Sequence, residues 1–147
     1  MEIILFEPEI PPNTGNIARL SAGLGLTLNL IKPLGFSLED KYLRRAGLDY
    51  WPLVTLKIFS DFSSFKENWT GGRLIATSAR QGSHFSSYEP FESDGLIFGP
   101  ETRGLPAWIV QQAEAVYNIP LKPGVRSLNL AATVGFFLGL SYSRLLD

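Results

Sequence analysis

The residues best placed to do chemistry lie in three loops, and the first of these runs from Glu7 to Arg19. Prolines stiffen its approach, Asn13 supplies a side-chain amide, and Gly15 lets the backbone come close to a ligand. Arg19 follows Ile17 by two residues, about 200° around a helix, so it points away from the apolar stripe. A guanidinium at this place suits a phosphate, which it can grip with two N–H donors. The spacing alone favours a plainer interpretation, a surface arginine on a helix.

The second loop follows an apolar run and spans Leu96–Pro106. Gly99 and Gly104 bend it, and Glu101 and Arg103 lie between them. A rigid loop that carries a charge pair at the end of a strand predicts one wall of a ligand site. A turn in which the two charged side chains only pair with each other, or with water, explains the same residues equally well.

The third loop covers residues 119–130, from the end of an apolar strand at Ile119 to the start of the last helix. Ser127 is placed to cap this helix, whose first backbone N–H groups could bind a polar group of a ligand. An ordinary capped helix is the alternative. All three loops follow predicted strands, and ligands of parallel sheets bind at the carboxyl ends of strands.

The sequence excludes several other chemistries. Cysteine is absent, which rules out disulfides, thiolate catalysis and cysteine-ligated zinc. His84 is the only histidine, so a Ser-His-Asp triad lacks a convincing base and no metal site is predicted. We interpret His84 as a loop residue. The pair Gly23-x-Gly25 lacks the third glycine of a dinucleotide-binding fingerprint and ends a helix instead of starting one.

Length and composition predict a single α/β domain over residues 1–147. Hydrophobic residues make up 45% of the chain and charged residues 18%, which is enough apolar material for one core. Apolar runs alternate with helical patterns, which predicts a mostly parallel sheet flanked by helices. The predicted strands are 3–6, 28–31, 53–59, 73–77, 96–98 and 116–119, and the predicted helices are 13–24, 37–46, 61–69, 106–114 and 128–145. Asn13 or Thr14 is placed to cap the first helix, and Ser37, with Asp40 three residues on, resembles a capping arrangement for the second.

The net charge of −1 argues against a strong standalone RNA binder, because neutralising phosphates takes a surplus of basic residues. A local basic cluster is nevertheless present, with Glu39 and Asp40 as its only acidic neighbours. A dimer would present two such clusters, although a solvated helix face explains the same charges. The members of the cluster are Lys32, Lys41, Arg44 and Arg45.

The apolar run at the amino terminus stops at Phe6 and has no basic segment before it, so we expect no signal peptide and a cytoplasmic protein. The most apolar stretch, Leu128–Leu140, is shorter than the about 20 residues that a membrane span takes. The helix that contains it is apolar on nearly all sides, with Gly135 and Gly139 four residues apart. Such a helix is either buried within one chain or packed against a second copy.

Together and in this order, the three loops resemble the motifs of the SPOUT (α/β-knot) RNA methyltransferases. The stretches LFEPEIPPNTGNIARL, KYLRRAGLDYW, FGPETRGLP and RSLNL carry the resemblance, which covers nearly the whole chain. It is most similar to the minimal tRNA (cytidine/uridine) 2'-O-methyltransferases, which act at the wobble position and lack an added RNA-binding domain. Ala132 and Gly139 depart from that pattern, since members often carry a polar and an aromatic residue there.

The resemblance implies a C-terminal trefoil knot, S-adenosylmethionine as cofactor, a homodimer and the tRNA anticodon loop as substrate, with no metal and no membrane. It implies cofactor contacts at Thr77, Gly99, Ile119, Ser127 and Leu128. The functional polar residues that it implies are Arg19, Glu101 and Asn129. We expect Arg19 to position an RNA phosphate and polarise the 2'-hydroxyl, and Glu101 to order the loops. The candidates for contact with the tRNA backbone are Lys41, Arg44 and Arg45.

Three alternatives stay open. The same reaction could act on another RNA, such as ribosomal RNA, because motifs that bind a cofactor do not name the substrate. A non-catalytic dimeric RNA-binding module could keep the knot, although the presence of Arg19, Glu101, Ser127 and Asn129 argues against it. A generic nucleotide-binding α/β protein is a third possibility, and the missing glycine fingerprint argues against that.

Overall fold

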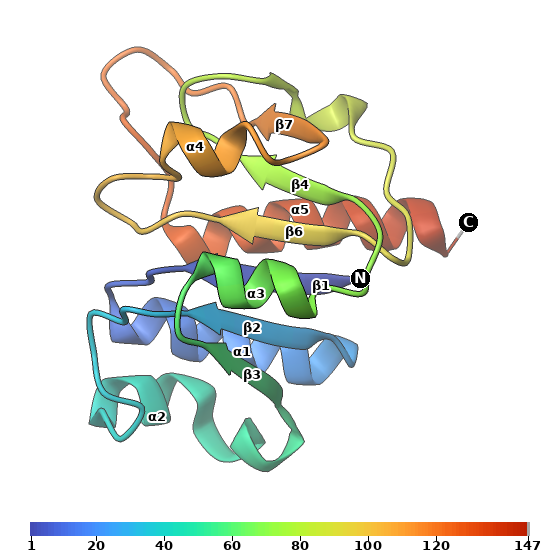
Figure 1. Cartoon of the computed structure of the whole chain (residues 1–147). Helices are drawn as coiled ribbons and strands as arrows, with labels where there is room; N and C mark the ends of the chain where they lie inside the picture. Colours follow the sequence, from blue (N-terminus) through green and yellow to red (C-terminus); the bar gives the residue numbers. More distant parts are fainter. Residues whose placement is uncertain (147) are drawn as a thin grey trace.

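Nearly continuous apolar runs form strands that are buried on both faces, as the inner strands of a parallel sheet are. The computed structural model describes residues 1–146 and has seven strands: β1 (Glu2–Phe6), β2 (Thr27–Ile31), β3 (Thr55–Phe59), β4 (Leu74–Thr77), β5 (Ser83–His84), β6 (Gly95–Phe98) and β7 (Ala115–Asn118). They form one sheet in the order β3-β2-β1-β6-β4-β7-β5 (Figure 1). Every pair of neighbouring strands is parallel.

Helices cover both faces of this sheet (Figure 1). The helices are α1 (Pro11–Leu24), α2 (Lys41–Gly47), α3 (Phe62–Asn68), α4 (Ala107–Val110) and α5 (Leu130–Leu145), with two short 3-10 helices, η1 (Leu48–Leu53) and η2 (Phe85–Ser87). One face carries α1 and α5, the other carries α3 and α4, and α2 packs against α1. The predicted α/β sheet, mostly parallel and flanked by helices, is confirmed.

Each face of the sheet has its own apolar core, because successive strand side chains point to opposite faces. Ile3 and Leu5 of β1 are buried in the core beneath α1 and α5, together with Val134. Ile4 is buried in the core beneath α3, together with Phe65. The two cores fix the sheet between its helices, so the loops at the carboxyl ends of the strands are held on a rigid base.

The start of α1 differs from the sequence prediction. The helix begins at Pro11, and Ile10 takes the N-cap position without a side-chain hydrogen bond. Asn13 and Thr14, which the sequence suggested as caps, lie inside the first turns and are buried. Proline is well suited to the first helical position because it has no N–H to satisfy. Neither Pro11 nor Pro12 has an N–H. The N–H of Asn13 donates a hydrogen bond to the carbonyl of Ile10 at 3.1 Å, so the N–H of Ile10 is the one that needs an acceptor outside the helix.

Two other helix caps also differ from those predicted. Asp40, and not Ser37, caps α2, and Asn129, and not Ser127, caps α5. The Asn129 side chain accepts a hydrogen bond from the backbone N–H of Ala132 at 3.1 Å. Serine, aspartate and asparagine all occur readily at N-caps, so spacing alone did not decide between neighbouring candidates.

Two elements are shorter than the sequence indicated, and one short strand was not predicted. The helix predicted over residues 106–114 is only α4, four residues long. The strand predicted from Leu53 begins at Thr55, because η1 with Pro52 inside it occupies the preceding residues. His84, expected in a loop, belongs to the two-residue strand β5, where its Nδ1 accepts a hydrogen bond from the backbone N–H of Ser86.

A buried carboxylate ties together the amino ends of β4 and β6. Asp94 is fully buried and accepts hydrogen bonds from Nε of Arg73 at 3.0 Å and from its Nη2 at 2.7 Å. It also accepts from the hydroxyl of Tyr88 at 2.8 Å and from the backbone N–H of Phe91 at 3.0 Å. Burial raises the pKa of the Tyr88 phenol, and the hydrogen bond to Asp94 raises it further. This cluster lies at the end of the sheet opposite the three loops.

Candidate active site

Three of the predicted cofactor residues lie at the carboxyl ends of neighbouring strands. Thr77 ends β4, Gly99 follows β6, and Ile119 follows β7. These strands are adjacent in the order β6-β4-β7, so their loops leave the sheet side by side (Figure 1). The Thr77 hydroxyl donates a hydrogen bond to the carbonyl of Ile97 at 3.2 Å and links two of the strand ends. The arrangement is the one in which parallel sheets bind ligands.

The second loop folds tightly back on itself at Gly99. A β-carbon there would come within 2.2 Å of the backbone nitrogen of Leu105 and 2.4 Å of the carbonyl carbon of Gly104. Gly104 has a φ of 69°, in the left-handed region. Glycine is therefore required at Gly99 for packing and favoured at Gly104 by backbone conformation, and the compact loop presents Glu101 to the first loop.

Glu101 supplies the acceptor that the start of α1 lacks. Its carboxylate accepts hydrogen bonds from the backbone N–H of Glu9 at 2.8 Å and from that of Ile10 at 3.1 Å. It also accepts one from the Asn13 amide at 3.3 Å. A negative charge is favourable at a helix N-terminus, where N–H groups are free. Glu101 thus caps a helix that precedes it by about ninety residues and joins the second loop to the first.

The first loop makes the reciprocal contacts. The Glu9 carboxylate accepts hydrogen bonds from the Thr102 hydroxyl at 2.7 Å and from its backbone N–H at 3.1 Å. The hydrogen bond from the Thr102 hydroxyl is the larger cause of the lowered pKa of Glu9, and that from its backbone N–H is the second. The stabilisation that these hydrogen bonds give is therefore present at neutral pH and is lost as the pH falls through the lowered pKa. Arg103 pairs with Glu7 at 3.0 Å, so Glu101 and Arg103 bind the first loop and not each other.

Asn13 extends the network to the third loop. Its Oδ1 accepts a hydrogen bond from Nδ2 of Asn129 at 2.8 Å, while its Nδ2 donates to Glu101. Asn13 is only 6% exposed. This linking role was not predicted, although the sequence carries a signal for it: Asn13 lies four residues before Ile17, on the buried face of the helix. A buried amide needs hydrogen-bond partners.

The structure does not bring every predicted residue into this network. Ser127 is exposed and Leu128 is half-buried in the segment before α5. No hydrogen bond among the described residues joins the Ser127 side chain to the other loops. Arg19 lies in the third turn of α1 and is exposed. Within residues 1–146, no hydrogen bond or ion pair links Arg19 to Glu101 or to Asn129. Its guanidinium instead lies over the ring of Tyr50, 5.3 Å from the centroid.

The comparison with protein families decides where the chain belongs. A family model described as the SpoU rRNA Methylase family matches residues 1–139. The chain belongs to this family. It is 46% identical over 136 residues to the tRNA (cytidine(34)-2'-O)-methyltransferase of Escherichia coli (strain K12), which covers 91% of this chain and 87% of that protein. The protein of the same description from Methylovorus glucosotrophus is 44% identical over 139 residues, 93% and 90% of the two chains.

Solved structures agree with this SpoU methylase assignment. A structure described as giving insights into the 2-OH methylation of C/U34 on tRNA matches with a TM-score of 0.94 at 44% identity, covering 99% of this chain and 95% of that one. The AdoMet-bound rRNA methyltransferase from Sinorhizobium meliloti matches with a TM-score of 0.89 over 99% of this chain and 57% of that one. At 22% identity the second match concerns the fold alone. The predicted SPOUT fold is confirmed.

The three basic residues predicted to contact RNA lie exposed on α2 of this SpoU methylase, but they are not equivalent. Arg44 pairs with Glu39 at 3.6 Å and donates its Nε hydrogen to the carbonyl of Leu38 at 2.8 Å. Lys41 lies over the ring of Tyr42, 5.0 Å from the centroid, and keeps its ammonium group free of any acidic partner in the described residues. Arg45 likewise has no ion-pair partner in residues 1–146. Lys41 and Arg45 are thus the more available cations.

The described residues contain neither a metal-binding cluster nor a membrane-spanning helix. No group of three or more histidine, aspartate or glutamate side chains in the described part of the chain could hold a metal ion. Every helix within residues 1–146 is too short or too polar to cross a bilayer.

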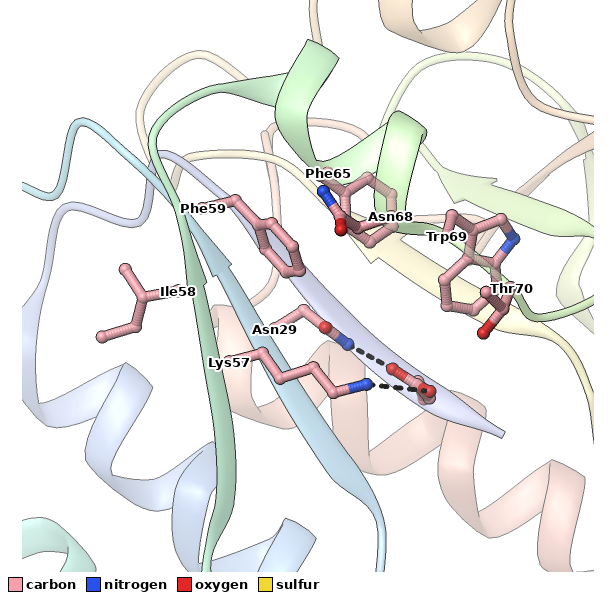
Figure 2. A pocket seen from close by; sticks show the side chains of 9 residues that line it. Asn29, Lys57, Ile58, Phe59, Phe65, Asn68, Trp69 and Thr70 are labelled. Atoms are coloured by element: carbon pink, nitrogen blue, oxygen red, sulfur yellow. Dashed lines mark hydrogen bonds and ion pairs between the residues drawn. The ribbon is translucent and has the colours of Figure 1, made fainter.

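A concavity of about 430 Å³ is lined by residues of β2, β3 and α3 (Figure 2). None of its lining residues belongs to the three loops. Phe59 and Trp69 line it above a polar floor (Figure 2). In that floor, Nδ2 of Asn29 donates a hydrogen bond to the Glu2 carboxylate at 2.7 Å, and Nζ of Lys57 lies 3.8 Å from the same carboxylate. Because these polar groups bind one another and no residue of the three loops lines the concavity, we assign no part of the reaction to it.

Proposed function

We propose that this chain, as one SPOUT methyltransferase domain, transfers a methyl group from S-adenosylmethionine to the ribose 2'-oxygen of the tRNA wobble nucleotide, cytidine or uridine 34. The observation that carries the proposal is the network in which Asn13 joins Glu101 to Asn129. It locks together three loops at one edge of the sheet. The similarity at 42–47% identity to proteins described as tRNA (cytidine(34)-2'-O)-methyltransferases supports the choice of substrate.

The strand ends fit S-adenosylmethionine by their chemistry. The loops after β4, β6 and β7 offer backbone N–H and carbonyl groups and the half-buried side chain of Ile119, which suit an adenosine better than a highly charged ligand. We assign cofactor binding to Thr77, Gly99, Ile119, Ser127 and Leu128. The trefoil knot that the resemblance implies stays a prediction, and we expect these loops to form it.

The proposed mechanism assigns positioning to Arg19. S-adenosylmethionine, when bound, supplies a methyl group on a sulfonium and is already a strong electrophile. Arg19 would grip an RNA phosphate and polarise the 2'-hydroxyl. The proton of that hydroxyl would pass to a phosphate oxygen while its oxygen takes the methyl group, and the S–CH3 bond would break to leave a neutral thioether. The guanidinium is not the base, because arginine side chains keep their proton in proteins. Glu101 is not the base in this scheme, since its carboxylate already accepts three hydrogen bonds from the first loop.

The variant Glu101→Gln is expected to weaken S-adenosylmethionine binding and to lower kcat/KM by about 10–100-fold, because an amide NH2 cannot accept the hydrogen bonds that the second carboxylate oxygen receives. Calorimetric titration and initial rates measure the two effects. Glu67→Gln is the matched control, because Glu67 is exposed on α3 and has no ion-pair partner in the part of the chain described. Unchanged affinity and turnover would remove Glu101 from the site.

We propose a homodimer that packs through α5. Phe136 on this helix is 50% exposed, and a β-carbon at Gly135 or Gly139 would meet nothing within 4 Å in the single chain. Such an apolar helix face with room for close approach suits a second copy. The single chain also leaves Arg19 apart from the loop network, which a second copy could complete.

The variant Gly139→Arg tests the dimer sharply. In an isolated chain it is expected to be neutral or slightly stabilising, because the site is open and glycine is a poor helix former. In a dimer packed through α5 it should halve the molar mass measured by light scattering. Gln111→Arg, exposed after α4 on the other face of the sheet, is the control. A variant that kept the molar mass of the wild type would exclude packing at this position.

We propose that Lys41, Arg44 and Arg45 contact the tRNA backbone. Replacing Lys41 and Arg45 together by alanine should lower the slope of log affinity against log salt by about 2, since each lost phosphate contact removes about 1. Arg44→Ala should have the smaller effect, because Arg44 is already paired with Glu39. Lys57→Ala, on the α3 face of the sheet, serves as control. An unaltered salt slope would rule the cluster out as an RNA contact.

Transfer of labelled methyl groups to total tRNA that lacks wobble 2'-O-methylation tests the proposed function. We expect label on nucleotide 34, and we propose that the chain acts on tRNA in the cytoplasm. Methylation of another RNA is the second candidate, and the family's description as rRNA methylases favours ribosomal RNA for it. Label on ribosomal RNA and none on tRNA would select that candidate. A chain that bound S-adenosylmethionine and RNA without transfer would be the non-catalytic module.

A further inference from the structure

Arg19 is one of the arginines without an acidic partner in the described residues, unlike three others that are tied to carboxylates. Arg73, Arg103 and Arg144 each lie within 3.0 Å of a carboxylate oxygen. Arg19 has no acidic partner in residues 1–146, and the interaction that the structure gives its guanidinium is with the ring of Tyr50, 5.3 Å from the centroid. An aromatic ring attracts a guanidinium through its π face, and it neither cancels the charge nor occupies the N–H donors.

The position of Tyr50 relative to α1 is built into the packing of two helices. Gly15 and Arg19 are four residues apart, so they lie on the same face of α1 in successive turns. A β-carbon at Gly15 would come within 2.4 Å of the carbonyl oxygen of Leu43 and 2.6 Å of the β-carbon of Ala46. Glycine at this position thus lets α2 lie directly against α1, one turn before Arg19.

The segment after α2 carries Tyr50 back to that face. Leu48 has a φ of 51°, an unusual conformation for a residue with a β-carbon, and it turns the chain from α2 into η1. A β-carbon at Gly47 would lie 2.4 Å from Nε1 of Trp51, which donates a hydrogen bond to the carbonyl of Arg44 at 3.1 Å. Trp51 therefore anchors η1 to the end of α2, and its neighbour Tyr50 is held beside Arg19.

We propose that Tyr50 is a positioning residue for the methyl transfer: its ring fixes the Arg19 guanidinium while leaving all the N–H donors free for an RNA phosphate. The inference rests on the proposed function of Arg19. A strained turn and two close glycine contacts serve to place one exposed ring against one exposed cation. Backbone strain of this kind is typical of functional sites.

The kinetic test compares three variants. Tyr50→Leu removes the ring and is expected to lower kcat by about 10–100-fold, as a misplacement of about 1 Å does, while KM for S-adenosylmethionine stays unchanged. Tyr50→Phe keeps the ring and should retain nearly full activity. Leu53→Ala, at the other end of η1 and 67% exposed, is the control for damage to this segment. Equal losses in the Leu and Phe variants would overturn the proposal.

A double-mutant comparison separates positioning from an independent role. In an Arg19→Gln background, measured in single turnovers, Tyr50→Leu should cause no further loss, because there is no cation left to orient. Losses that multiply would show that Tyr50 acts without Arg19 and would overturn the inference.

An NMR measurement tests the contact without any activity. The Nε–Hε signal of Arg19 should carry a ring-current shift that Tyr50→Phe keeps and Tyr50→Leu removes. A signal that is insensitive to Tyr50→Leu would overturn the inference whatever the rates are. A ring-dependent signal in a chain that does not methylate the wobble ribose would instead overturn the proposed function and leave the contact established.

Discussion

Replacing Arg19 by alanine is expected to lower the rate of methyl transfer to tRNA by about 10²–10³-fold, the loss typical of removing one charged donor from a reacting centre. Affinity for S-adenosylmethionine should stay within about twofold, because no hydrogen bond or ion pair in the described chain joins the Arg19 side chain to the second or third loop. Single-turnover rates and cofactor titration separate the two effects. The expected loss is large because alignment of the reacting oxygen is the main contribution that this site has to make.

The conservative variant Arg19→Lys sharpens this prediction. It keeps the positive charge but not the planar pair of N–H donors, so we expect it to stay at least about tenfold below the wild type. Lys57→Ala, a change of a cation on the α3 face of the sheet, should leave the rate unaffected. Full activity of Arg19→Lys would show that a bidentate grip on phosphate is not what Arg19 provides.

The largest effect on stability is expected at Asp94. Asp94→Ala should lower the free energy of unfolding by about 2–4 kcal/mol, because it leaves the Tyr88 hydroxyl without an acceptor and Arg73 without its charge partner. This loss is smaller than that expected for a fully buried ion pair, since the Arg73 side chain is 32% exposed and can be hydrated. Urea unfolding, monitored by fluorescence, measures the change.

Two controls distinguish this prediction from a general loss of fold. Glu89→Ala removes an ion pair whose acid is 76% exposed and should change the free energy of unfolding by less than about 1 kcal/mol. The Asp94 cluster lies at the amino ends of β4 and β6, so Asp94→Ala should keep its kcat at temperatures where it is folded. A stability change as small as that of Glu89→Ala would mean that the buried hydrogen bonds do not hold these strands.

Much of the fold could be predicted because its strands have a plain signal. The runs that became β1, β2, β4 and β6 are apolar and bounded by turn residues, and the alternation with helical patterns indicated a parallel sheet. Short elements could not be predicted in this way. A two-residue strand such as β5 has no periodicity to detect, and α4 ends after a single turn where the pattern suggested more.

The partners of the site residues could not be predicted, for a physical reason. The sequence marked Glu101 as a charged residue in a rigid loop. The hydrogen bonds that its carboxylate accepts come from the start of α1, some ninety residues earlier, where no side chain of the helix itself acts as a cap. Pairing of Glu101 with Arg103 was an equally good interpretation until each was found bound to the first loop. Local spacing carries no information on contacts between loops, which the order β6-β4-β7 determines.

The position of a helix cap shows a similar limit. Ser127 and Asn129 are both good caps, and choosing Ser127 placed the start of the last helix two residues too early. The difference affects function, because Asn129 caps α5 with its oxygen and donates its amide hydrogen to Asn13. One side chain thus both begins a helix and closes the network of the site.

The most direct test of the central claim is methyl transfer to an anticodon stem-loop RNA that carries a single 2'-deoxy nucleotide at position 34. If the wobble 2'-hydroxyl is the acceptor, this RNA should take up no labelled methyl group. The same RNA with the 2'-deoxy sugar at the neighbouring position 35 should be methylated at nucleotide 34. Label that persisted on the 34-deoxy RNA would contradict the account, because the methyl group would then be going to another atom.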